Sequence, residues 1–130
     1  MKAYSSKRRF VLSSFSAGGH GGLVFRSGKD GDHSTRLNCV FVDVAALETR
    51  CWFSGLVVEE VDRRYLSRFA SKPIEMLEPG VRVFRVSSPG AWEGYVLASG
   101  FLICEDEKNV MEPMDVLWPP EENQDVPRNS

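Results

Sequence analysis

The chain has 130 residues, of which 42% are hydrophobic, and its formal net charge is −2. This length is typical of one compact domain, and so much apolar surface excludes a chain that is disordered throughout. No apolar run approaches the roughly 20 residues that a membrane-spanning helix requires, and the first run is too short for a secretory signal. We therefore expect a soluble, cytoplasmic protein with a single β-rich domain over residues 1–118 and an acidic, disordered tail over residues 119–130.

The charges are distributed unevenly along the chain. Residues 1–36 contain seven Lys or Arg against two Asp, whereas residues 105–130 contain two Lys or Arg against eight Asp or Glu. The acidic part could meet a basic partner, or the two ends could lie near each other in the fold and neutralise each other. We favour the second interpretation.

The first half of the chain contains a predicted hairpin and the strongest predicted strand. Two β-prone runs, residues 10–16 and 23–26, flank a glycine-rich segment, which is typical of two paired strands. Residues 35–44 then alternate between apolar and other side chains. This period of two predicts a strand whose core-facing residues are Leu37, Cys39 and Phe41.

Further strand patterns follow along the chain. Residues 45–48 indicate a bend or bulge, after which the pattern resumes over residues 49–53 and 56–61, on either side of Ser54 and Gly55. A change to a period near four then predicts a short helix that Asp62 caps and Pro73 ends, with one face made of Val61, Tyr65, Leu66 and Phe69.

The remaining elements determine the predicted fold class. Residues 81–86 alternate as a strand does, and residues 92–105 form a long strand with a bulge expected at Gly100. The connections between strands are too short for the helical crossovers of a parallel sheet. We predict a mainly β (α+β) fold: an antiparallel sheet, forming a sandwich or partly open barrel, of about seven strands with one short helix.

The cysteines do not predict a disulfide or a metal site. They are three in number, far apart, and each lies in an apolar run: Cys39, Cys51 and Cys104. An odd number of cysteines in an apolar setting is typical of buried free thiols.

Several catalytic and cofactor patterns are excluded by their spacing. The glycines and Lys29 of residues 22–30 do not match a phosphate-binding loop, and Asp30 occupies the position where that loop needs Ser or Thr. Phe41 stands where a calcium loop beginning at Asp30 would need Glu. No serine or cysteine has the sequence context of an activated nucleophile. The sequence therefore predicts no catalytic residue, no cofactor and no metal.

The two histidines are candidates for a ligand site. His20 lies in the glycine-rich segment and His33 in a polar turn, where an imidazole would be accessible. Their spacing matches no zinc pattern. The alternative interpretation is that both are solvated loop side chains.

Large aromatic and clustered acidic side chains are candidates for partner binding. Tryptophan is enriched at binding hot spots, and of Trp52, Trp92 and Trp118 the last two lie at the ends of predicted elements, so we take Trp92 and Trp118 as candidates. The acidic candidates are Glu105, Asp106 and Glu107. The alternative roles are core packing for the tryptophans and a solvated strand end for the carboxylates.

Nucleic-acid binding is disfavoured. Two basic groups could touch phosphates, one at residues 7–9 and one formed by Arg63, Arg64 and Arg68. The net charge is negative, however, and no nucleic-acid-binding module is recognisable.

Four segments, residues 10–14, 23–27, 41–44 and 92–96, resemble those of small uncharacterised bacterial proteins, some of which are similar to immunity proteins of polymorphic toxin systems. The resemblance spans residues 9–106 and carries no catalytic residue over to this chain. It implies a non-enzymatic protein-binding module that neutralises a toxin.

Two other hypotheses belong to different classes. The first is a small ligand-binding protein or enzyme with a cavity inside a β-barrel or sandwich, with His20 and His33 at its mouth. The second is a homo-oligomer that buries an apolar edge or face in a second copy.

Overall fold

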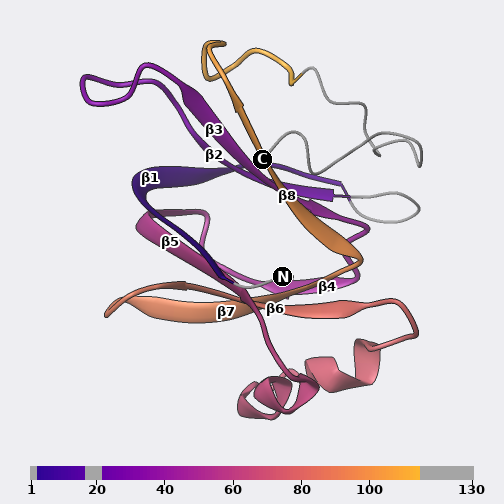
Figure 1. Ribbon diagram of the computed structural model, residues 1–130. Coiled ribbons are helices and arrows are strands. Elements are labelled where there is room, and N and C mark those ends of the chain that lie inside the picture. The colour runs from indigo at the N-terminus through magenta and orange to yellow at the C-terminus, as the bar shows by residue number, and fades with distance from the viewer. Residues whose placement is uncertain (1–2, 17–21, 115–130) are drawn as a thin grey trace.

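The computed structural model describes residues 3–16 and 22–114, which form one antiparallel sheet of eight strands (Figure 1). The strands are β1 (Ala3–Phe15), β2 (Gly22–Ser27), β3 (Arg36–Val42), β4 (Ala46–Glu48), β5 (Trp52–Glu60), β6 (Arg82–Ser88), β7 (Trp92–Ala98) and β8 (Gly100–Asp106). Their hydrogen-bonded order is β4-β7-β6-β5-β1-β2-β3-β8, which leaves β4 and β8 at the two ends of an unclosed sheet. The predicted mainly β, antiparallel fold is confirmed. His20, Trp118 and the predicted tail lie outside the described residues.

The sheet folds over on itself because its long strands change neighbours along their length. β1 pairs with β5 over residues 3–11 and with β2 over residues 11–15. Only Ser99 separates β7 from β8, and residues 43–45 separate β3 from β4. Figure 1 accordingly shows β1, β2, β3 and β8 above β4, β5, β6 and β7.

The interior between the two halves of the sheet is occupied by one hydrophobic cluster. Phe41 is fully buried there, and its ring centroid lies 6.0 Å from that of Phe25, 5.5 Å from that of Phe84 and 4.7 Å from that of Phe101. The predicted core residues of β3 belong to this cluster, which consists of Phe10, Leu23, Phe25, Leu37, Cys39, Phe41, Phe53, Leu56, Val58, Phe84, Val86, Val96 and Ala98. Such dense aromatic packing supplies most of the hydrophobic stabilisation of a domain of this size.

Two outer faces of the sheet are also covered. The short helices η1 (Arg63–Arg68) and η2 (Pro73–Met76) lie below β6 and β7 in Figure 1 and bury Leu66, Val83, Tyr95 and Leu97. Residues 107–114 follow β8, and Met114 packs on an outer cluster of β2, β3 and β8 that consists of Val24, Val40, Leu102 and Cys104. None of the described helices is long and apolar enough to cross a bilayer.

The single predicted helix is replaced by two short 3₁₀ helices. Asp62 caps η1 as predicted, because its carboxylate accepts a hydrogen bond of 2.8 Å from the backbone N–H of Arg64. Pro73 begins η2 and does not end the first helix. A proline is tolerated at a first helical position because the N–H that it lacks would have no partner there.

The described sheet has eight strands where about seven were predicted, and their bounds differ in three places. Residues 46–48, where we predicted a bend or bulge, form β4. The two predicted strands on either side of Gly55 join into β5. Gly55, with a positive φ of 83°, lies where the pairing of β5 with β1 shifts register between Ser6 and Arg9, and glycine adopts this conformation without strain. The long strand predicted over residues 92–105 is divided into β7 and β8.

Candidate functional site

Asp106, one of the three acidic partner-binding candidates, forms a structural ion pair. Arg36 lies opposite it on β3, is fully buried, and donates from Nε and Nη2 to the two carboxylate oxygens of Asp106 at 2.9 and 2.8 Å. Burial acts to raise the pKa of Asp106, but hydrogen bonds from Arg36 and from the backbone N–H of Lys108 lower that pKa overall. Arg36 also donates from Nη1 to the backbone carbonyls of Asn109 and Glu112, so it holds residues 107–114 on the sheet.

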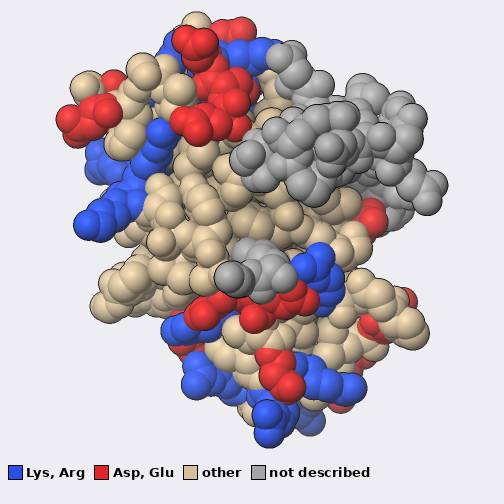
Figure 2. Space-filling model, in the orientation of Figure 1, with Lys and Arg blue, Asp and Glu red and all other residues tan. Residues whose placement is uncertain are grey.

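The other two acidic candidates also lie beside basic residues of the N-terminal part. Glu105 accepts a hydrogen bond from the Thr35 hydroxyl and lies 3.7 Å from Nη2 of Arg8. Lys29 donates to the backbone carbonyl of Glu107 at 2.7 Å. On the face shown in Figure 2, Lys and Arg side chains accordingly lie beside Asp and Glu at both ends of the molecule. The two charged parts of the chain thus contact each other at Glu105 and Asp106, whereas the Glu107 carboxylate makes no ion pair within the described ranges. Four of the eight acidic residues of the C-terminal part lie outside the described residues, so neutralisation of the two ends as a whole stays a prediction.

His33 makes a local contact in the turn between β2 and β3. Its Nδ1 lies 3.0 Å from Oδ1 of Asp30. Backbone N–H donation from Asp32 lowers the pKa of Asp30, and the contact with His33 lowers it further. Among the described residues, no three His, Cys, Asp or Glu side chains lie close enough to hold a metal ion.

Trp92 lies partly in the core and partly at the surface. Its ring centroid is 5.0 Å from that of Phe53, in an edge-to-face arrangement. Its indole Nε1 is buried and has no hydrogen-bond partner in the described part of the chain. Leaving such a donor unpaired costs about 1–3 kcal/mol.

Trp52 is the most exposed aromatic side chain of the described residues, at 76%. It lies on the outer side of β5, directly opposite Val11 of β1, which is 45% exposed. Three exposed cations precede these two residues in the chain, Lys7 and Arg9 on β1 before Val11 and Arg50 before Trp52, and none makes an ion pair with another described residue. We call these five side chains the Trp52 surface.

The sequence contained a signal for this surface that our choice of candidates missed. Phe53 is a core residue of β5, and neighbouring residues of a strand point to opposite sides. Trp52 must therefore point away from the core, whereas Trp92 packs against it.

A cleft of about 530 Å³, which we call the Trp52 cleft, lies beside this surface. One wall is the segment that leads into β5, and the other is the turn between β6 and β7. Its lining residues are Thr49, Arg50, Cys51, Trp52, Phe53, Ser54, Ser88, Ala91 and Trp92, of which only Arg50 is charged. The cleft thus combines aromatic walls with one cation.

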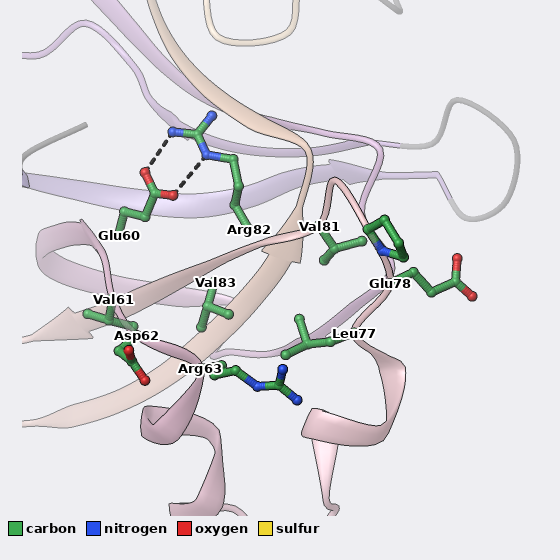
Figure 3. Close-up of a pocket in the computed structure, with 10 residues that line it drawn as sticks. Glu60, Val61, Asp62, Arg63, Leu77, Glu78, Val81, Arg82 and Val83 are labelled. Atoms are coloured by element: carbon green, nitrogen blue, oxygen red, sulfur yellow. Dashed lines mark hydrogen bonds and ion pairs between the residues drawn. The ribbon is translucent and has the colours of Figure 1, made fainter.

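A second cleft, of about 590 Å³, lies where β5 leads into η1 (Figure 3). Arg82 donates from Nε and Nη2 to Glu60 at 3.0 and 2.7 Å, and Asp62 caps η1. Two further charged residues, Arg63 and Glu78, line this cleft and are exposed. Its apolar lining residues Val61, Leu77, Val81 and Val83 belong to or pack against the cluster beneath the helices.

The prediction that all three cysteines are buried is wrong for Cys51. Cys39 and Cys104 are buried, but Cys51 is exposed because it lies in the connection before β5 and not within a strand. Burial raises the pKa of Cys39 to about 12. We expect a thiol reagent at pH 8 to modify about one thiol per native chain, and Cys51→Ser to remove this reaction, because only an accessible thiolate reacts. Fast modification of Cys51→Ser would contradict this expectation.

Comparison of the chain with protein-family models, with curated proteins and with solved structures found no match. Its function must therefore be inferred from its residues and their geometry.

Proposed function

We propose that the protein is a non-enzymatic binding module that docks an acidic protein partner on the Trp52 surface. The observation that carries the proposal is the 76% exposure of Trp52 on an otherwise well-packed sheet. An exposed tryptophan beside an apolar neighbour has the composition of an interface hot spot, where a few aromatic and arginine side chains carry most of the binding free energy. Exposing an indole to water is unfavourable, and a partner would remove that cost.

The charges around Trp52 favour an acidic partner. Lys7, Arg9 and Arg50 carry positive charge that no described residue neutralises. Complementary charges at an interface rim accelerate association and suppress binding of unsuitable partners. Within the acidic cluster at the end of β8, by contrast, Asp106 is already paired.

Toxin neutralisation in the cytoplasm is the narrower form of this proposal. The partner would then be a toxin that presents an acidic patch to Arg9 and Arg50. A basic partner would use Glu107 instead, since its carboxylate is exposed.

A ligand held inside the sheet is less well supported. The inward-facing side chains form one continuous cluster, and His33 is bonded within its own turn. A homo-oligomer would use the same Trp52 surface, and light scattering of the purified protein distinguishes it from a complex with another protein.

The test is affinity capture from nuclease-treated native cells with the tagged full chain and four variants. Trp52→Ala is expected to lower recovery of the partner at least tenfold, because a hot-spot residue contributes about 2 kcal/mol or more, and Arg9→Glu is expected to lower it as well. Met111→Ala is the matched control, since Met111 is an apolar side chain that is 88% exposed. Glu107→Lys tests the alternative of a basic partner.

Three outcomes would contradict the proposal. The first is equal recovery of the partner with Trp52→Ala and Met111→Ala. The second is a recovery of the partner that only Glu107→Lys lowers. The third is a partner that is recovered from untreated cells but not from nuclease-treated cells. Circular dichroism of Trp52→Ala verifies that the variant folds, because substitution of an exposed side chain changes stability by only about 0.5 kcal/mol.

A further inference from the structure

The Trp52 cleft is large enough to hold one side chain of a partner. Its volume of about 530 Å³ falls within the range of about 300–1,000 Å³ that is usual for ligand sites. The two segments that form it, residues 49–54 and 88–92, are adjacent because β4 pairs with β7 and β5 pairs with β6. The hydrogen-bonded pairing of the strands therefore fixes the positions of the two walls of the cleft.

The walls of the cleft suit an aromatic group. The ring of Trp92 already packs on Phe53, but the ring of Trp52 has no aromatic partner among the described residues. Aromatic rings attract one another in offset or edge-to-face arrangements. An incoming ring would thus find a free aromatic face at Trp52.

The charged groups around the cleft suit a negatively charged ligand. Arg50 is the one charged lining residue, and Arg9 lies on β1 opposite Ser54, which also lines the cleft. The described lining contains no carboxylate, so nothing within it neutralises Arg50.

We propose that the Trp52 cleft takes an aromatic side chain that is flanked by carboxylates in an exposed segment of the partner protein. This inference rests on the proposed function and names the group that anchors the partner. The ring packs on Trp52, and the flanking carboxylates lie against Arg50 and Arg9. Arg9 and Arg50 then determine the charge of the accepted segment, and Trp52 determines its aromatic character.

The test uses three synthetic peptides, labelled with fluorescein and blocked at both ends, and the full chain. The first peptide has one phenylalanine between pairs of aspartate or glutamate, the second has alanine in place of phenylalanine, and the third has lysines in place of the acidic residues. Fluorescence polarisation is expected to show the first peptide binding at least about ten times more tightly than either of the others. Trp52→Ala and Arg50→Ala are each expected to weaken that binding at least about fivefold, and Met111→Ala to leave it unchanged.

Equal binding of the three peptides, no binding of the first, or unchanged binding by Trp52→Ala would overturn the inference. The two proposals can fail separately. Capture that depends on Trp52 without selective binding of the first peptide overturns the anchor chemistry and leaves the binding module standing. Selective peptide binding without capture that depends on Trp52 overturns the proposed binding module and shows only that the cleft accepts the peptide.

Discussion

Asp106→Asn is expected to destabilise the protein by about 3–5 kcal/mol at pH 7, because the substitution leaves a buried cation without its counter-ion. Arg36 is fully buried, and Asp106 meets it with both carboxylate oxygens. The amide of asparagine can accept a hydrogen bond, but it cannot neutralise the charge. Burying an unpaired guanidinium is costly in an environment from which water is excluded.

Urea unfolding measures this loss, and the neighbouring carboxylate provides a matched control. Glu107→Gln removes the same kind of charge at an exposed site where no described residue pairs with it, so we expect a change within about 0.5 kcal/mol. Equal and small effects of the two substitutions would show that the ion pair contributes little.

The pH dependence of the unfolding free energy tests the contribution of this ion pair independently. The pKa of Asp106 is lowered in the folded protein, so its contribution to stability is present above the unfolded pKa of about 3.9 and is lost as the pH falls through the lower folded value. The difference in unfolding free energy between the wild type and Asp106→Asn should therefore be full at pH 7 and should shrink below about pH 4. A difference that grows as the pH falls would contradict this assignment.

Gly94→Ala is expected to destabilise the protein by about 3 kcal/mol, the upper end of the usual cost of overpacking. A Cβ at residue 94 would lie 1.9 Å from the backbone carbonyl oxygen of Glu48 and 3.4 Å from the ring of Trp92. Backbone of β4 cannot move aside as a flexible side chain does, so the pairing of β4 with β7 must open. Because β4 leads directly into residues 49–51, one wall of the Trp52 cleft moves with it.

Thermal unfolding measures the loss, and Gly31→Ala is the control. Nothing lies within 4 Å of a Cβ built at Gly31, so we expect that substitution to be neutral or slightly stabilising through the unfolded chain. Gly94→Ala should also weaken capture of the partner while Gly31→Ala does not. A folded Gly94→Ala variant of unchanged stability would show that β4 is free to shift.

The strands of the core could be predicted from the sequence because their physical signal is local. The alternation around Leu37, Cys39 and Phe41 identifies one face of β3, and the structure buries those residues. The burial of Arg36 and Asn38 on the opposite face could not be predicted, since it depends on β8 and residues 107–114, which are distant in sequence. Local patterns reveal periodicity but not what covers the second face of a sheet.

The start of β1 and the candidate site also depend on contacts between distant segments, which local sequence patterns do not reveal. Residues 3–9 are polar and basic, so their composition hides a strand that exists through its pairing with β5. The position of Trp52 beside a core phenylalanine was a usable signal, but its cationic neighbours come from β1 and from the connection before β5. Only the register between the two strands brings Arg9 beside Ser54 and Val11 beside Trp52.

Fluorine NMR of the protein labelled with 5-fluorotryptophan would show whether Trp52 is buried by the partner. The resonance of Trp52 is assigned with Trp52→Phe. It is expected to shift when the captured, unlabelled partner is added. It is also expected to lose its sensitivity to exchange of H₂O for D₂O, because an interface hot spot is shielded from water. A Trp52 resonance that keeps its position and its solvent sensitivity in the complex would contradict binding at the Trp52 surface.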